Sequence, residues 1–425
     1  MKRTMRVGIL SSIITVLVMV LFGCGGQGSE SGDKVQITFS HWATGPEAKI
    51  YDDLIAVFEK EHPEIKVKQI RIPFDGYADK VQTMMAGRTE PDVMYMSHLW
   101  FPSFVERDAF LNLQPHIDRD NEFRKDDFHP VLAEAGKYRG DTYWIPRDLD
   151  YLVLFYNKDL FREAGVDFPN ENWSWADLLN AAKKLTRDTN GDGRVDQYGI
   201  LAPDGYIAFA WIWQNGGSVL NEERTQSLID QPAATEAVQW ISDLINQEKV
   251  APSPQVTKQE GTSEMFKAGR VAMATYGHWL IPSLKEEKAF DWGVTLLPKG
   301  KAGRMSFVSG SGYTISKNTK HPDAAWKLVK WLNSPESQEK MSKLGLIVPS
   351  RKSVYESDTF MNTPENKVFV DQTKYLRELP VTTYWNEMFD VIQKEFTLVW
   401  MGDKSAAEAT REIDRQVDAI LKKRK

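Results

Sequence analysis

Residues 35–96 alternate between stretches with the two-residue period of strands and stretches with the spacing of helices. The strand-like stretches are VQITFS (35–40), IKVKQIRI (65–72) and DVMYM (92–96), and the helical stretches cover 46–62 and 77–86. Because this repeated strand–helix order is typical of parallel βαβ units, we predict an α/β fold with right-handed crossovers. Ligands of such sheets bind at the carboxyl ends of the strands.

The rest of the chain continues this mixture of helices and strands. Two strand-like halves flank Pro146–Asp150 within residues 142–157, and strand residues flank a Gly- and Ser-rich stretch at 306–316. Further strands are predicted at 271–276 and 292–297, and further helices at 174–187, 233–247, 263–267, 322–332 and 405–421. The length of 425 residues predicts two or three domains.

The composition excludes several classes of protein. Hydrophobic residues make up 42% of the chain and charged residues 26%, which is ordinary for a globular protein. The formal net charge of -6 argues against a nucleic-acid-binding protein. The single cysteine can form neither an intramolecular disulfide nor a metal site built of several cysteines.

The first residues have the pattern of a secretory signal peptide. Three basic residues lie within 1–6, and an apolar run follows from 7 to 22, shorter than the roughly 20 residues of a membrane-spanning helix. The run ends in Leu-Phe-Gly-Cys24, which looks like a bacterial lipobox. We therefore expect a signal peptide at 1–23, lipidation of Cys24, a flexible tether over 24–34, and a protein anchored by lipid to the outer face of the cell membrane.

One loop has the spacing of a calcium site. The sequence DTNGDGRVD (188–196) matches the first nine positions of an EF-hand-like loop, but position 12 is Gly199, where the motif has a bidentate glutamate. The predicted ligands are Asp188, Asn190, Asp192, Arg194 through its carbonyl, Asp196 and Gln197. The alternative is a turn without metal, because Asn-Gly and Asp-Gly favour turns. A structural Ca²⁺ is expected, and no cofactor for activity.

Tryptophans follow the predicted strands at the positions where a parallel sheet opens its cleft. Trp42, Trp100 and Trp279 each lie within four residues after the end of a predicted strand. Aromatic faces at such positions suit the apolar faces of sugar rings, and core packing is the alternative. No G-x-S-x-G, H-E-x-x-H, Walker or kinase signature occurs, so an enzyme is unsupported.

Several stretches together resemble the extracellular solute-binding proteins of sugar ABC transporters, the family that includes maltose-binding protein. Besides the lipobox they are ITFSHW, LIAVFEKEHPEIKV, MMAGRTEPDVMYMS, YWIPRDLDYLVLFYNKDLFREAGV, WSWADLLNAAKKLT, DTNGDGRVDQYG, FKAGRVAMATYGHW, WGVTLLP and HPDAAWKLVKWLNSPESQEK. The resemblance implies a two-lobed type II α/β fold with the ligand cleft between lobes joined by crossing strands. The crossings would lie near 146–151 and near 308–313, where Gly310 and Gly312 could absorb dihedral changes. One lobe would comprise 35–147 and 310–349, and the other 148–309 and 350–425.

The resemblance also implies a set of ligand-binding residues. Carried over onto this chain, they are His41, Trp42, Ser97, His98, Trp100, Arg147, Asp148, Asp150, Trp211, Trp213, Gly277, His278, Trp279, Tyr384 and Trp385. Some alginate-binding relatives carry a calcium loop where 188–196 lies here. Arg147 could pair with an acidic sugar or with its neighbouring aspartates, so the charge of the ligand stays open.

The function implied is that of a monomeric receptor that captures a sugar, such as an oligosaccharide, and delivers it unchanged to the permease subunits of an ABC transporter. Three alternatives remain open at the level of sequence. They are a secreted polysaccharide lyase or hydrolase, a binding protein for another solute such as glycerol phosphate, a polyamine or iron, and a structural surface lipoprotein.

Overall fold

The computed structural model describes residues 34–423, which form two main sheets. The first sheet has five strands in the order β2-β1-β3-β13-β6, and the second has four in the order β11-β8-β10-β9. The predictions of a signal peptide, of Cys24 lipidation and of most of the tether lie outside the described residues. Within 34–423, no helix has the length and apolar composition needed to cross a membrane.

The first sheet contains the βαβ units that the sequence predicts. β1 (Val35–His41) pairs in parallel with β2 (Ile65–Arg71) and β3 (Val93–Ser97), and α1 (Gly45–Glu61) and α2 (Tyr77–Ala86) make the connections. Along β2 the apolar residues at 65 and 67 are buried and the lysines at 66 and 68 are exposed. β13 (Ser311–Ile315) then joins β3 antiparallel, and β6 (Ile145–Pro146) lies at the edge.

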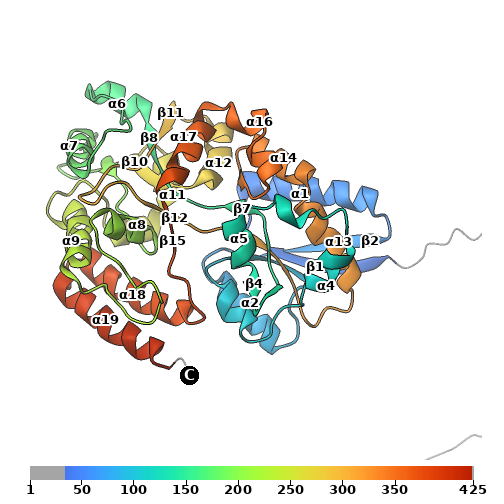
Figure 1. The fold of residues 1–425 in the computed structure, drawn as a ribbon. Helices are drawn as coiled ribbons and strands as arrows, with labels where there is room; N and C mark the ends of the chain where they lie inside the picture. Colours follow the sequence, from blue (N-terminus) through green and yellow to red (C-terminus); the bar gives the residue numbers. More distant parts are fainter. Residues whose placement is uncertain (1–33, 424–425) are drawn as a thin grey trace, which may run out of the picture.

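The second sheet is built around two strands without polar faces. All residues of β8 (Val153–Asn157) and β10 (Val271–Tyr276) are buried, and these strands pair antiparallel. β11 (Trp292–Thr295) and β9 (Tyr198–Ile200) complete the sheet. Helices α9 (Pro232–Asn246), α18 (Trp385–Trp400) and α19 (Ala406–Leu421) pack on one another at the far end of this half of the molecule (Figure 1). α7 (Trp175–Leu185) begins with a capping box formed by Ser174 and Asp177.

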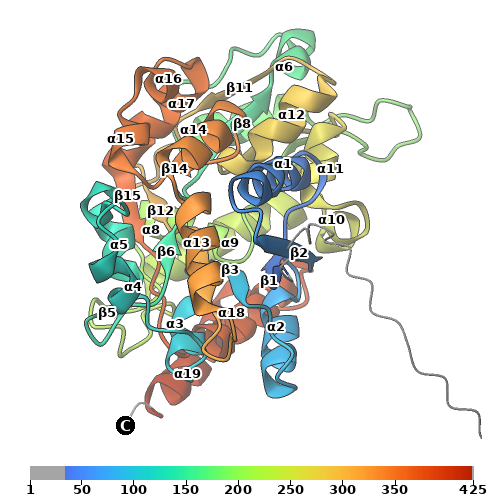
Figure 2. The same cartoon turned by 90° about the vertical axis from the view of Figure 1, so that its right-hand side faces the viewer.

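Crossing segments join the two halves of the molecule. Residues 147–150 run antiparallel to 309–311, where the Arg147 amide donates to the Ser311 carbonyl at 2.8 Å and the Asp150 amide to Ser309 at 2.9 Å. On the other side, β7 (Asp148–Leu149) pairs with β14 (Val348–Pro349). In Figure 2, α13 (Pro322–Leu332), whose residues also pack on β13, lies in front of β3 and β6. The arrangement is two-lobed, as predicted.

Gly310 lies where two crossing segments approach each other closely, because a Cβ there would lie 2.5 Å from the Asp148 carbonyl oxygen. The role of Gly310 and Gly312 in dihedral changes stays a prediction. Arg351, assigned by prediction to the second lobe, donates to Phe123 and pairs with Asp127 of the first. The lobe boundaries, including the one at 349/350, stay predictions.

Candidate functional site

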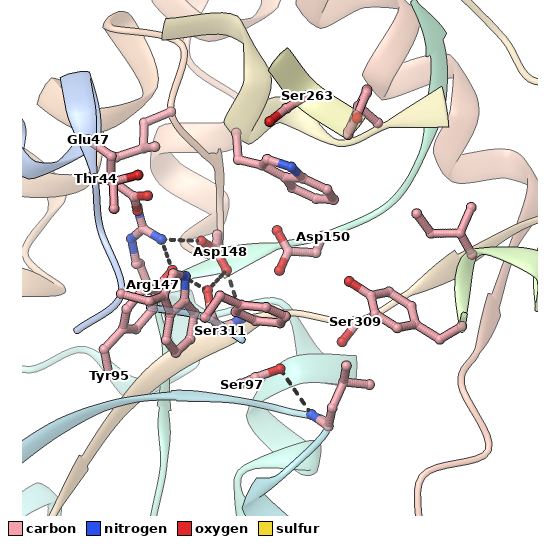
Figure 3. A pocket seen from close by; sticks show the side chains of 18 of the residues that line it. Thr44, Glu47, Tyr95, Ser97, Arg147, Asp148, Asp150, Ser263, Ser309 and Ser311 are labelled. Atoms are coloured by element: carbon pink, nitrogen blue, oxygen red, sulfur yellow. Dashed lines mark hydrogen bonds and ion pairs between the residues drawn. The ribbon is translucent and has the colours of Figure 1, made fainter. Parts of the chain in front are cut away.

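A cavity of about 510 Å³ lies between the two lobes, beside the crossing segments. Its lining comes from the loops after β1 and β3, the crossings themselves, and the second lobe around α8 (Ile207–Gln214), α11 (Thr262–Lys267) and β10. Figure 3 shows these side chains converging on one open space from several elements. The position agrees with the rule that ligands bind at the carboxyl ends of parallel strands.

Aromatic residues line both lobes of the cavity. Trp42 follows β1, and its ring stacks on Tyr95 with 3.8 Å between the ring centroids. Trp279 follows β10, and a Cβ added to Gly277 would collide with its ring, so the glycine makes room for the indole. The lining aromatics are Trp42, Phe74, Tyr95, Tyr206, Tyr276, Trp279 and Phe307. Such a surface can pack against flat apolar faces of a ligand.

An ion-pair network lies at the first-lobe side of the cavity. Arg147 Nη1 lies 2.8 Å from Asp148 Oδ2, and Arg147 Nη2 lies 3.2 Å from Glu47 Oε1. Asp148 Oδ1 accepts from both the amide and the hydroxyl of Ser311, each at 2.7 Å. Burial nevertheless raises the pKa of Glu47 and of Asp148, since the charge of Arg147 only partly offsets it.

Asp150 is the acid of this cavity that its neighbours leave free. Its backbone pairs with Ser309, but its carboxylate accepts no hydrogen bond from the residues that the structure describes (Figure 3). Burial, followed by the nearby charge of Asp148, raises the pKa of Asp150 well above its usual value. Six serine and threonine side chains also line the cavity, namely Thr44, Ser97, Thr262, Ser263, Ser309 and Ser311. The cavity therefore combines aromatic faces with groups that bind hydroxyls.

The three predicted histidines lie behind this surface. His41 stacks on Tyr51 and bonds Gln69 at 2.9 Å, and His278 bonds Asn366 at 2.7 Å. His98 borders a second cavity of about 180 Å³. Burial lowers the pKa of each of the three to about 4, so all are neutral at pH 7. They do not line the interlobe cavity.

Several predicted aromatics are also placed elsewhere. α8 is apolar on all sides, so Trp211 is fully buried and Trp213 nearly so. Trp385 is enclosed in the same core and stacks on Phe389, while Tyr384 reaches toward Lys423. Trp100 packs behind the cavity wall, with its edge against Trp42. Rings enclosed in the hydrophobic core cannot stack on a ligand in this arrangement of the protein. We therefore do not propose these aromatic residues as ligand contacts.

Most of the second-lobe lining carries no signal in the sequence. Tyr206, Thr262 and Ser263 lie at helix starts that carry no motif. Two other lining groups were also missed: Ser309 and Ser311 alternate along the crossing stretch, and Glu47 lies in the first turn of α1. The serine alternation was the one signal available, because alternate residues of a strand face the same side.

Hydrogen bonds among its own residues hold the loop at 188–196. Asp188 accepts from the amides of Gly191 and Gly193, and Asp192 accepts from the amide of Arg194. The Gln197 side chain donates to the Leu185 carbonyl. Across residues 34–423, no group of three or more His, Cys, Asp or Glu side chains converges as a metal site would require.

The family follows from comparison with known proteins. The family model described as bacterial extracellular solute-binding protein matches residues 42–339, which include both crossings near 147–150 and 309–311. The chain belongs to this family. The resemblance inferred from the motifs is therefore confirmed.

Solved members of this family share the fold. An ABC substrate-binding protein of Listeria monocytogenes, in complex with cycloalternan, superposes with a TM-score of 0.86 at 27% identity, over 92% of this chain and 100% of that chain. The GacH receptor of Streptomyces glaucescens, solved unliganded and with acarbose, gives 0.82 at 28% identity with the same coverage. An arabinooligosaccharide-binding protein of Bacillus subtilis is 22% identical over 344 residues, which is 77% of this chain and 76% of that protein. The two-lobed type II fold is confirmed.

Proposed function

We propose that this solute-binding protein captures an oligosaccharide in the interlobe cavity and delivers it, unchanged, to an ABC transporter permease. The observation that carries the proposal is that Trp42 and Trp279, one from each lobe, line the same cavity as the Asp150 carboxylate. Sugar rings have apolar faces and hydroxyl edges, and this lining offers a partner for each. The volume of about 510 Å³ is within the range of small-molecule sites.

Ligand binding would favour the closed arrangement of the lobes. Trp42 and Ser97 come from the first lobe, and Tyr206 and Trp279 come from the second. A ligand can satisfy both sets of contacts only when the lobes are together, so its binding energy stabilises that state. Closure is then the signal that the permease recognises.

The ligands of similar proteins support this class of solute. The structures from Listeria and Streptomyces hold cycloalternan and acarbose, and the Bacillus protein is named for arabinooligosaccharides. We propose that this chain, too, binds an oligosaccharide, and that it acts as a monomer. We also propose a lipid anchor at Cys24, which the lipobox supports.

Thermal unfolding of the purified full-length protein against a panel of saccharides tests the proposal. A ligand at 100 times its dissociation constant adds about 2.7 kcal/mol to the free energy of unfolding, which raises the midpoint by a few degrees. A shift with one saccharide class, and recovery of that saccharide intact, is expected. Recovery of cleaved product would make the protein an enzyme, and a shift only with phosphorylated or amine solutes would overturn the carbohydrate assignment.

A structural Ca²⁺ at 188–196 remains a prediction from the spacing of its oxygens. We expect Ca²⁺ at 100 times its dissociation constant to add about 2.7 kcal/mol to the free energy of unfolding of EGTA-treated protein. Asp188→Asn, which removes the first ligand, should abolish the gain. Equal unfolding midpoints with Ca²⁺ and with EGTA would show that the loop is a turn without metal.

A further inference from the structure

More acidic than basic side chains line the interlobe cavity. Its lining includes three carboxylates, Glu47, Asp148 and Asp150, against the single cation Arg147, and it includes no lysine or histidine. Charges between low-dielectric walls act on a ligand more strongly than the same charges in water. The lining of this cavity can therefore discriminate between ligands of different charge.

The one cation is fully engaged by the protein. Arg147 is 2% exposed, its guanidinium pairs with Asp148 and Glu47, and it also donates to the Tyr95 hydroxyl. The same group lies over the Tyr95 ring, 4.8 Å from its centroid. A ligand carboxylate would have to displace one of these acids, which would then stay buried without a counter-ion. Arg147 is thus a poor partner for an acidic sugar.

Among the three acids, Asp150 is the one left for the ligand. Both oxygens of Asp148 are used by Ser311 and Arg147, and Glu47 is paired with Arg147. Figure 3 shows the Asp150 carboxylate directed into open space, with no dashed line to another side chain. The ionised form of Asp150 accepts from a ligand hydroxyl or ammonium and repels a ligand carboxylate. A ligand ammonium also favours this ionised form, against the burial that raises the pKa of Asp150.

We propose that the cavity selects its saccharide by charge: it rejects uronates, accepts neutral sugars, and binds a protonated amino sugar more tightly than the neutral sugar of the same backbone. Asp150 sets the preference for the amine. The inference rests on the proposed function, since it concerns the same cavity and the same ligand class.

Titration calorimetry at pH 7 with the full-length protein tests this selectivity. The probes are trisaccharides of the gluco, manno and galacto series, each as the neutral sugar, its 2-amino form and its uronate form. For any backbone that binds, we expect the uronate to bind at least 100-fold more weakly than the neutral sugar, and the amine at least tenfold more tightly. A uronate that binds as tightly as its neutral counterpart would overturn the proposal.

Asp150→Asn isolates the charge of this residue while keeping its backbone pairing. The variant should bind the amine no more tightly than the neutral sugar. The ratio of the dissociation constants of the uronate and the neutral sugar should be at least tenfold smaller than in the wild type. Asp403→Asn makes the same change of charge at an exposed turn and should leave all three affinities unaltered. A preference for the amine that persists in folded Asp150→Asn protein contradicts the assignment. If no trisaccharide of any charge binds, the proposed function itself fails, an outcome distinct from binding with the wrong charge order.

Discussion

At the scale of single residues, the position of Trp279 depends on its neighbour Gly277. A Cβ at Gly277 would occupy the space of the indole ring, so Gly277→Ala must move that ring within the cavity. We expect the substitution to weaken saccharide binding at least tenfold, about 1.4 kcal/mol, and nearly as much as Trp279→Ala. Titration calorimetry measures both. Gly87→Ala is the control, because a Cβ there would meet only ordinary contacts at 3.6 Å or more. Unchanged affinity in Gly277→Ala would mean that Trp279 does not contact the ligand.

His278 gives the stability of the protein a dependence on pH. Burial lowers its pKa to about 4, against 6.5 in the unfolded chain, although the bond to Asn366 opposes the shift. Between these values the unfolded chain holds a proton that the folded chain does not, so stability is complete above pH 6.5 and falls toward pH 4. At pH 5 this residue alone costs about 2 kcal/mol of the free energy of unfolding.

His278→Gln tests this dependence, because glutamine keeps an amide donor but cannot titrate. We expect the free energy of unfolding, measured by urea denaturation, to fall from pH 7 to pH 5 in both proteins. The fall should be about 2 kcal/mol smaller in the variant than in the wild type. His62→Gln, at a partly exposed imidazole, is the matched control and should follow the wild type. Identical pH dependence in His278→Gln and the wild type would place the cause in other groups.

The sequence identifies the ends of strands where a ligand would bind, but not the direction of each side chain. His41 and Trp42 are adjacent, and successive side chains of an extended chain point to opposite faces. Trp42 faces the cavity and His41 faces the core, where it stacks on Tyr51. Which of the two faces opens toward the other lobe is decided by contacts between segments hundreds of residues apart, such as the crossing at 309–311. A single sequence does not contain that information.

At the scale of elements, the crossing segments are packed so closely that one of them needs glycine. A Cβ on Gly310 would lie 2.5 Å from the Asp148 carbonyl oxygen and 3.2 Å from the Leu132 side chain. We expect Gly310→Ala to lower the free energy of unfolding by about 1–3 kcal/mol, the usual cost of overpacking. Urea denaturation measures the loss, and Gly87→Ala should change stability by about 0.5 kcal/mol or less. A Gly310→Ala protein as stable as the wild type would show that the crossings can separate at no cost.

Helices and strands with a clear hydrophobic period were predicted with accurate bounds. For helices that are buried on every side, the sequence led to a wrong role for the side chains. The helix at 77–86 and the strand at 271–276 have the bounds that their patterns indicate. α8 illustrates the second case, because IAFAWIWQ has no polar face and its tryptophans were assigned to the ligand. Apolar surface on every side indicates a buried helix, and its neighbours α9 and β12 (Ser306–Val308) complete that burial.

At the scale of the whole molecule, an ion pair links the two lobes outside the cavity. Lys49 of α1 lies 2.6 Å from Glu286 of α12 (Ile281–Glu287), and both side chains are exposed, by 72% and 48%. A pair so exposed contributes little to the stability of the fold. It can still shift the balance between open and closed lobes, because the apparent affinity of a ligand scales with the population of the state that binds it.

Reversing this charge should therefore weaken binding without touching the cavity. We expect Lys49→Glu, which sets two acids against each other, to raise the dissociation constant of the saccharide roughly two- to fivefold. The double variant Lys49→Glu/Glu286→Lys restores the pair with opposite polarity and should restore the affinity. In 1 M salt, where screening acts within about 3 Å, the three proteins should bind alike. If the double variant binds as weakly as the single one, the effect comes from lost packing of the lysine stem rather than from charge, and the lobes close without help from this pair.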